Sequence, residues 1–164
     1  MRHPALAQSR QVTEADWDLV AAFHAQCSEQ NLLRRWGRTR ITPRDLSQLL
    51  GHTQCWVGLG ADEQPLALVC VGPVSREPGA FDLGLQVVDH RHRQGIGTAV
   101  ARQAALLART RGGHTLAAFV HASNAPMLRL LGRLGPTRHS RDGPYVDVRV
   151  DLDALAPGPE MAPP

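Results

Sequence analysis

The sequence "RHRQGIGTAV", at residues 91–100, could bind a phosphate group. Two glycines, Gly95 and Gly97, stand one residue apart at the start of a long run of helix-forming residues. A turn of this kind aims successive backbone N–H groups at one point, where the helix N-terminus adds partial positive charge. Glycine also lets a phosphate approach the backbone without a Cβ in the way. Further donors at the rim could come from His92, Arg93 and Gln94. This chemistry suits a diphosphate.

Two other nucleotide-binding motifs do not fit residues 91–100. A dinucleotide-binding fingerprint needs a third small residue where the sequence has Val100, and an acidic residue roughly 20 positions further on. A Walker loop needs Gly-Lys-Ser or Gly-Lys-Thr, and the sequence has no lysine, so all 18 of its basic residues are arginine. A helix N-terminus that only packs tightly against its surroundings is the simpler alternative for these glycines.

The elements that would position the loop follow from hydrophobic patterns and capping residues. Thr42, Pro43 and Asp45 fit the N-cap, the first and the third position of a helix. The pair Gly112-Gly113 would end the longest helix. We predict helices at 13–27, 28–36, 42–50, 95–113 and 124–135, and strands at 5–12, 54–60, 66–74, 81–88, 114–121 and 145–152.

This order of elements predicts an α+β fold with a mixed, mostly antiparallel sheet. The strands at 54–60 and 66–74 would form a hairpin, and the strand–helix–strand order from 81 to 121 needs a parallel crossover. With 164 residues the chain has the length of one domain. We expect residues 1–153 to form that domain and the Ala- and Pro-rich residues 154–164 to be a disordered tail.

Composition limits the classes of function. The net charge of +3 is mild and scattered, so a nucleic-acid partner is not expected. No apolar run approaches the ~20 residues of a membrane span, and the N-terminal residues lack the apolar core of a secretory signal. We therefore expect a cytoplasmic protein without a membrane partner. Cys27, Cys55 and Cys70 lack metal-ligand spacing, so neither a metal site nor a catalytic cysteine is expected.

The loop and the segment around Asn124 together resemble the GNAT superfamily of N-acyltransferases. That superfamily carries Arg/Gln-x-x-Gly-x-Gly/Ala after its fourth strand, and this sequence has His92-Arg93-Gln94-Gly95-Ile96-Gly97, with His in the first position. The superfamily also carries a strand, an Asn and a helix that ends in Leu-Gly-Phe. Here Asn124 precedes a helix that ends in Leu134-Gly135-Pro136. The resemblance spans residues 5–151 and implies a GNAT fold whose fourth and fifth strands splay apart.

The resemblance implies acetyl-CoA as the co-substrate. The pyrophosphate would lie on backbone amides of the loop, and the pantetheine arm would pair with the end of the strand at 81–88. Asn124 would cap the helix that follows it and also touch the coenzyme. The residues expected to contact the coenzyme are Val87, Val88, His92, Arg93, Gln94, Gly95, Ile96, Gly97, Thr98 and Asn124.

Within the superfamily, the chain is most similar to the bacterial Pat-type protein lysine acetyltransferase domains. These have Asn-x-x-Met-Leu in the helix after the Asn, as in "NAPMLRLLGRLG", and no tyrosine there. Leu131 takes the position of the tyrosine that protonates the leaving thiolate in many GNAT enzymes, so the thiolate would leave unaided or take a proton from water. Residues 28–36 resemble the Ser-x-x-Ser-x-x-Arg-Phe helix of the same domains, which implies that Arg34, Arg35 and Trp36 lie on the acceptor side.

The same resemblance suggests a general base. Pat-type domains carry a Glu on the fourth strand, and the matching position is Asp82, which is one methylene shorter, so a bridging water would complete its reach to the amine. His121 is the rival candidate, because an imidazole titrates in a suitable range and this one ends the strand at 114–121. Asp89 and His90 are expected on the loop surface.

These features predict an N-acetyltransferase in which a primary amine attacks the thioester of acetyl-CoA directly. The acceptor would be a protein lysine or a small-molecule amine, such as an aminoglycoside. The arginine-rich residues 34–40, "RRWGRTR", disfavour a polycation and favour an anionic partner or a protein surface. We expect a monomer or a homodimer. The alternative is a catalytically degenerate GNAT fold that acts as a CoA-binding or protein-interaction module.

Overall fold

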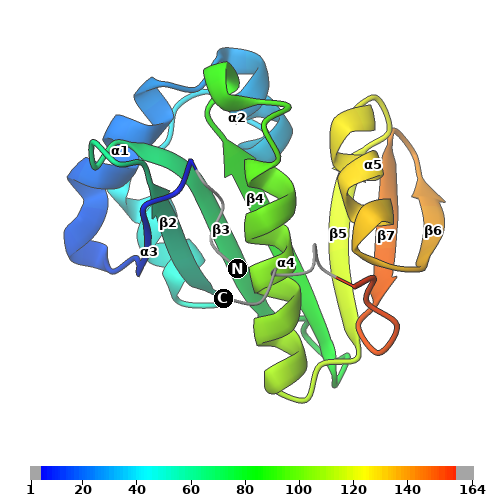
Figure 1. Cartoon of the computed structure of the whole chain (residues 1–164). Helices are drawn as coiled ribbons and strands as arrows, with labels where there is room; N and C mark the ends of the chain where they lie inside the picture. The colour runs from blue at the N-terminus through cyan, green and yellow to red at the C-terminus, as the bar shows by residue number, and fades with distance from the viewer. Residues whose placement is uncertain (1–4, 158–164) are drawn as a thin grey trace.

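The structure is a computed structural model that describes residues 5–157, which form one seven-stranded sheet with helices on both faces (Figure 1). The helices are α1 (Trp17–Ala25), α2 (Glu29–Trp36), α3 (Pro43–Leu50), α4 (Ile96–Thr110) and α5 (Ala125–Leu134), with the 3-10 turns η1 (Glu14–Asp16) and η2 (Asp89–Arg91). The strands are β1 (Gln8–Gln11), β2 (Gln54–Leu59), β3 (Pro65–Pro73), β4 (Ala80–Val87), β5 (Thr115–His121), β6 (Thr137–Asp142) and β7 (Tyr145–Asp151). The division into a domain at 1–153 and a disordered tail at 154–164 stays a prediction, because residues 158–164 lie outside the described part.

Helices α2 and α3 begin at the predicted capping residues. The Ser28 hydroxyl accepts a hydrogen bond from the Asn31 backbone N–H at 3.2 Å. Thr42 and Asp45 form a reciprocal capping box at the start of α3, so that each side chain accepts from the other residue's backbone. Gly37 follows α2 with a φ of 69°, the left-handed conformation that commonly ends a helix.

The sheet has the order β1-β2-β3-β4-β5-β7-β6 and is antiparallel except between β4 and β5. These two parallel strands pair at three positions only, of which the last joins Asp82 to Ala117. Beyond that pair they diverge, as Figure 1 shows for the green and the yellow strand. We call the unpaired region between residues 83–87 and 118–121 the strand gap. The predicted α+β fold with a splayed strand pair is therefore confirmed.

Side-chain alternation along β4 separates two layers of the molecule. Val87 lies against Gly97 of α4, whereas Gly84 and Gln86 contact side chains of α2. Helices α4 and α5 consequently cover one face of the sheet, and α1 and α2 lie on the other (Figure 1). The core between these layers is made of small and branched apolar residues, including a run of buried alanines along α4.

The sequence did not predict β6, and it made β1 too long. The residues of β6 are polar on both faces and almost all exposed, because this edge strand pairs with β7 alone. They therefore lack the hydrophobic alternation that identifies a strand. Although β7 is the last strand in the sequence, it lies inside the sheet, between β5 and β6. The first strand has four residues instead of the predicted span 5–12.

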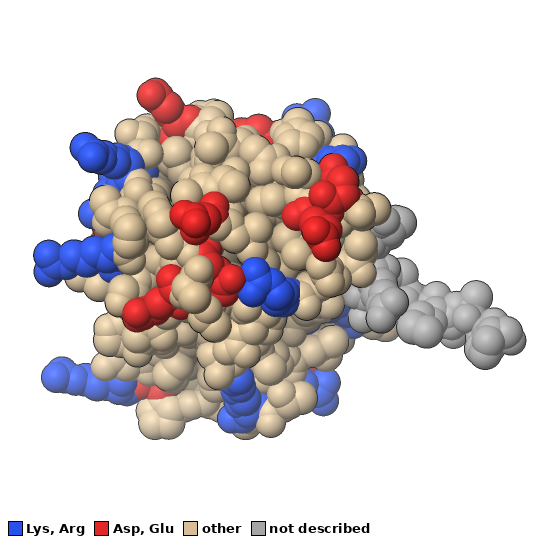
Figure 2. All heavy atoms as spheres, turned by 90° about the vertical axis from the view of Figure 1, so that its left-hand side faces the viewer, with Lys and Arg blue, Asp and Glu red and all other residues tan. Residues whose placement is uncertain are grey.

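The charged surface is mixed on the side that Figure 2 shows. The arginines and the acidic side chains of the described residues are interspersed on this face. Among residues 5–157, no helix combines the length and the apolar character needed to cross a membrane.

Candidate active site

The predicted phosphate-binding loop joins β4 to α4 through η2. Gly95 has a φ of 82° and is the N-cap residue of α4, where no side chain caps the helix. The first helical hydrogen bond runs from the Ala99 N–H to the Gly95 carbonyl at 3.0 Å. The N–H groups of Ile96, Gly97 and Thr98 therefore have no acceptor within the helix. Three donors that point the same way at a helix N-terminus suit an anion.

Gly97 packs closely against neighbouring elements. A Cβ at this position would lie 3.0 Å from Leu130 Cδ1 of α5 and 3.7 Å from Val87 Cγ2 of β4. A larger side chain would therefore have to displace Leu130 or extend into the space in front of the helix. The exposed residues beside this turn are His92, Arg93 and Gln94. The structure thus gathers the predicted residues 92–98 around one helix N-terminus.

The end of β4 presents backbone groups to the strand gap. Val88 is turned away from the gap, because its N–H donates to the Leu66 carbonyl of β3 at 3.0 Å. Alternation along an antiparallel strand turns the groups of Val87 in the opposite direction, toward the gap. The Val87 carbonyl accepts from Asn31 Nδ2 at 2.8 Å and from His92 Nε2 at 2.9 Å. Of the two predicted valines, Val87 is therefore the one whose backbone can meet an extended ligand.

Asp89 connects the loop to helix α2. Its carboxylate accepts hydrogen bonds from the Ser28 N–H at 2.8 Å, the Ser28 hydroxyl at 2.7 Å and Asn31 Nδ2 at 3.0 Å. Although partial burial acts in the other direction, these bonds hold the pKa of the Asp89 carboxyl below its usual value. Sequence reasoning placed Asp89 on the loop surface. In the structure it fixes the start of α2 to the end of β4.

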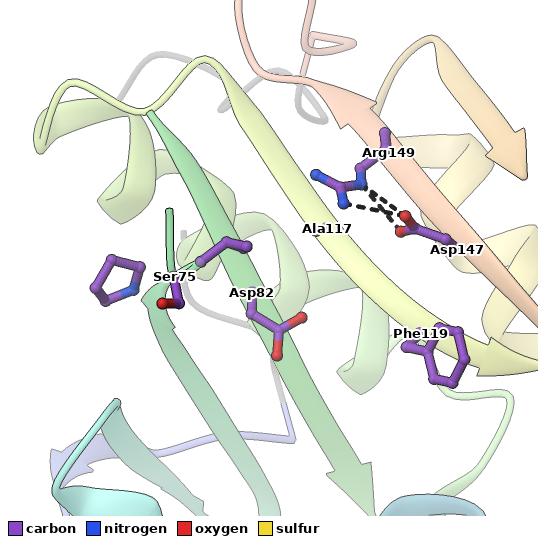
Figure 3. Close-up of a pocket in the computed structure, with 8 residues that line it drawn as sticks. Ser75, Asp82, Ala117, Phe119, Asp147 and Arg149 are labelled. Carbon is purple, nitrogen blue, oxygen red and sulfur yellow. Dashed lines mark hydrogen bonds and ion pairs between the residues drawn. The ribbon is translucent and has the colours of Figure 1, made fainter. Parts of the chain in front are cut away.

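Asp82 opens into a cavity of about 350 Å³ on the α2 side of the sheet, where β4 and β5 separate (Figure 3). Asp147 and Arg149 of β7 stand across β5 from it and form a bidentate ion pair at 2.9–3.1 Å. Arg149 also pairs with Glu77 at 2.6 Å. The cavity is lined by Pro73, Val74, Ser75, Asp82, Ala117, Phe119, Asp147 and Arg149.

The environment of Asp82 raises the pKa of its carboxyl above the usual value, because the surrounding protein removes part of its hydration. The guanidinium of Arg35 opposes this shift, and Arg149 opposes it more weakly. Arg35 extends from α2 onto the same face of β4, where it lies over Gly84. Asp82 is thus a carboxylate in a cavity between two guanidinium groups.

His121 and Asn124 lie at the other end of the strand gap. His121 is four residues beyond the last paired residue of β5, which corresponds to roughly 13 Å along a strand. Its Nδ1 lies 2.7 Å from the Ser123 hydroxyl, and its ring packs edge-on against Tyr145. Asn124 caps α5, since its side chain accepts from the Met127 N–H at 3.3 Å. Leu131, further along α5, is fully buried.

Trp36 belongs to a partly buried polar cluster below the cavity. Its Nε1 lies 3.2 Å both from His24 Nε2 and from Gln86 Oε1. Burial lowers the pKa of His24 to about 4, so this imidazole is neutral at physiological pH and can accept from Trp36. Trp36, which the resemblance implied on the acceptor side, is half-buried, and its indole N–H is bonded inside this cluster.

Three features lie together along β4. They are a helix N-terminus with unpaired N–H donors, a parallel strand pair that splays apart, and a carboxylate at the point where the two strands diverge. The sequence profile of the acetyltransferase (GNAT) family matches residues 17–135. The chain belongs to this family. Its members transfer an acetyl group from acetyl-CoA to an amine, and they are acyltransferases. No curated protein matches the sequence.

Solved GNAT structures share the fold at low sequence identity. The GNAT domain of S. lividans PAT aligns with a TM-score of 0.77 and 19% identity, over 87% of this chain and 89% of that one. PaiA N-acetyltransferase from Thermoplasma acidophilum was solved in complex with coenzyme A. It aligns with a TM-score of 0.70 and 13% identity, over 88% of this chain and 98% of that one. A ribosomal-protein-alanine N-acetyltransferase from Brucella melitensis aligns with a TM-score of 0.67 and 18% identity, over 88% of this chain and 99% of that one.

The residues around the α4 N-terminus suit the acetyl-CoA that this family uses. The uncapped N–H groups of residues 96–98 can receive a pyrophosphate. The Val87 carbonyl already accepts from Asn31 and His92, so the backbone group that Val87 can offer to an extended arm is its N–H on the gap side of β4. Among residues 5–157, no group of three or more His, Cys, Asp or Glu side chains could hold a metal ion.

Proposed function

We propose that this chain acetylates a primary amine, with Asp82 as the general base. The observation that carries the proposal is the position of Asp82, at the last position where β4 pairs with β5 and open to the cavity. There it is beside the strand gap, in which the thioester of a bound acetyl-CoA would lie. The coenzyme supplies an activated acetyl group, and the protein supplies binding, orientation and proton transfer.

Binding of the coenzyme would use mainly backbone groups. We assign the pyrophosphate to the N–H groups of Ile96, Gly97 and Thr98, and the pantetheine arm to the Val87 edge of β4. His92 and Asn124 would contribute from opposite sides of the gap. Because backbone donors supply most of this site, His92 in place of the usual Arg or Gln does not weaken the proposal.

Proton transfer would take place on the cavity side. An amine reaches the enzyme mainly as an ammonium ion, and it must lose a proton before it attacks the carbonyl carbon. The Asp82 carboxylate, directly or through one water, accepts that proton. In the described chain, the Tyr145 ring of β7 packs against Phe119 and His121 toward the end of β5, beyond the level of Asp82, and Leu131 has no proton to give. The thiolate would therefore leave unaided or take a proton from water.

The test is the rate of thiol release from acetyl-CoA with a panel of amines and lysine peptides. We expect the wild type to release thiol from acetyl-CoA only when an amine is present. In Asp82→Asn the rate of this release should fall strongly, whereas the affinity for acetyl-CoA should not change. Asp142→Asn, at an exposed aspartate of the edge strand β6, is the matched control and should remain active. Acetyl-CoA binding without release for any amine would instead identify a CoA-binding module. Full turnover by Asp82→Asn would remove this residue from the mechanism.

A further inference from the structure

We propose that the acceptor is an amine that carries a carboxylate next to its amino group, of the α-amino-acid class, and that Arg35 binds this carboxylate. The inference rests on the proposed N-acetyltransfer and names the substrate class of the same site. It is carried by the position of Arg35, by its lack of an anionic partner and by the shape of the cavity beside Asp82.

Arg35 lies on the acceptor face of β4 because Gly84 leaves room for it. A Cβ on Gly84 would lie only 2.6 Å from Arg35 Cζ and 3.0 Å from Nε, so any other residue would displace the guanidinium. Gly84 and Asp82 are two positions apart on one strand, and their side chains share a face, at a spacing of roughly 7 Å. The structure therefore places a guanidinium next to the proposed base.

The arginines near Asp82 differ in their ion pairs. Arg149 is held by Asp147 and Glu77. Across residues 5–157, no carboxylate lies within 4.0 Å of the Arg35 guanidinium. This half-buried cation contacts the Trp36 ring, at 4.9 Å from Cζ to the ring centroid, and the thiol of Cys70. Asp82 acts on this guanidinium at longer range without forming an ion pair with it, so an anionic ligand in direct contact would stabilise a partly desolvated charge.

An α-amino acid matches this pair of charges. A guanidinium binds a carboxylate through two parallel N–H···O bonds, a geometry that an ammonium group cannot reproduce. With its carboxylate on Arg35, such a ligand would direct its amino group to Asp82. Its side chain would enter the cavity, whose walls include Pro73, Val74, Ala117 and Phe119. A lysine side chain brings no carboxylate next to its amine, so it would leave Arg35 without a counterion.

The experiment compares matched acceptors in the full chain. L-leucine, L-methionine and L-phenylalanine are each assayed beside their own carboxamide, which keeps the amine and removes the negative charge. We expect the wild type to prefer the acid by about tenfold or more in kcat/KM, mainly through a lower KM, because a charge-assisted bidentate pair is at stake. Arg35→Gln should abolish the preference, and Arg35→Lys should retain part of it.

The ratio of acid to carboxamide isolates carboxylate binding from other roles of Arg35. A change in the pKa of Asp82 would alter both acceptors alike, so it would not move the ratio. Arg133→Gln removes an exposed arginine from α5, on the other face of the sheet, and should leave the ratio unchanged. Gly84→Ala, which pushes the guanidinium away from the sheet, should lower the ratio and serves as the second variant if Arg35→Gln does not fold.

Three results would overturn the inference. Equal use of acid and carboxamide by the wild type would do so, as would a preference that survives both Arg35→Gln and Gly84→Ala. Acetylation of lysine peptides in clear preference to every amino acid would do so as well. In each of these cases amine acetylation itself stands. If no amine, acid or carboxamide increases thiol release, the proposed function fails, and this inference fails with it.

Discussion

The two sides of the strand gap are built in different ways. On the side proposed for the coenzyme, the available groups are backbone groups of one continuous segment, residues 87–98, at the start of α4. The acceptor side uses side chains that come together from α2, β4, β5 and β7, such as Arg35, Asp82, Phe119 and Asp147. This difference explains why a candidate ligand site that consists of one turn can be predicted from a local sequence motif. A site made of side chains on separate elements depends on the topology.

The same contrast extends to charge. The coenzyme side offers N–H dipoles, which no change of pH removes. The acceptor side has titratable groups whose pKa values respond to one another, and the pKa of the exposed Asp82 carboxyl is raised by partial loss of hydration against the opposing effect of Arg35. If this division is correct, variants on the two sides should separate coenzyme binding from turnover.

The largest effect is expected on the acceptor side. Asp82→Asn should lower kcat by about 100-fold or more, since a general base contributes 10²–10⁴-fold in typical enzymes, with little change in the Kd of acetyl-CoA. The wild-type rate should rise with pH through a pKa above the usual aspartate value of about 3.9, because the ionised form is the base.

Asp82→Asn should also change stability in the opposite direction to activity. The raised pKa means that folding favours the protonated carboxyl, so ionisation at neutral pH destabilises the fold. We expect the variant to melt at the same or a higher temperature than the wild type at pH 7. That advantage should shrink as the pH falls below the raised pKa of Asp82. A lower melting temperature at pH 7 would contradict the sign of this shift.

The next effect is expected on the coenzyme side. Gly97→Leu should weaken acetyl-CoA binding by about 30-fold, or about 2 kcal/mol, because its side chain would fill the space in front of α4 or displace Leu130. Calorimetric titration measures the change. Gly132→Ala is the control, since a Cβ at Gly132 meets nothing within 4 Å. Equal affinity of wild type and Gly97→Leu would exclude this turn from the site.

Asp89→Asn tests the connection between the two sides. Loss of charge-assisted bonds to Ser28 and Asn31 should cost about 1–2 kcal/mol of stability at pH 7 and weaken acetyl-CoA binding by about fivefold. The pKa of Asp89 is lowered in the fold, so its stabilisation is present above about pH 4 and is lost as the pH falls through the folded pKa. Melting curves of wild type and variant should therefore converge in acid. A difference in melting temperature between wild type and Asp89→Asn that is the same at pH 7 and at pH 3 would contradict a stabilising role of the ionised Asp89 carboxylate.

The smallest effect is expected for His121→Ala. The His121 ring is roughly 13 Å along β5 from the level of Asp82 and is bonded to Ser123. We expect less than about threefold change in kcat/KM near pH 7.5, where a base would matter. A pH–rate profile that loses its acidic limb in His121→Ala, and keeps it in Asp82→Asn, would reverse the two roles.

Local signals predicted the fold well where one segment determines the structure. Thr42, Pro43 and Asp45 marked the start of α3, and Gly95 and Gly97 marked the turn before α4. These positions depend on caps and backbone conformation, which neighbouring residues set. The sequence could not reveal β6, because its polar residues carry no pattern and only pairing with β7 makes them a strand.

Contacts between distant segments were the part that sequence reasoning missed. The bonds from Ser28 and Asn31 to Asp89 join residues 58–61 positions apart. The position of Arg35 had one visible signal, Gly84, since a glycine inside a strand often marks the close approach of another group. The glycine indicates that another group lies against β4 at this position, and only the fold shows that this group is the Arg35 guanidinium.

The short pairing between β4 and β5 links heat resistance to the supply of coenzyme. Three paired positions connect strands β1–β4 to strands β5–β7 within the sheet, and α4 packs across the same boundary. An extended ligand in the strand gap would add backbone bonds along that boundary. Ligand at 100 times its Kd would raise the free energy of unfolding by about 2.7 kcal/mol. The melting temperature and the protease resistance of this protein would then rise and fall with the acetyl-CoA concentration around it.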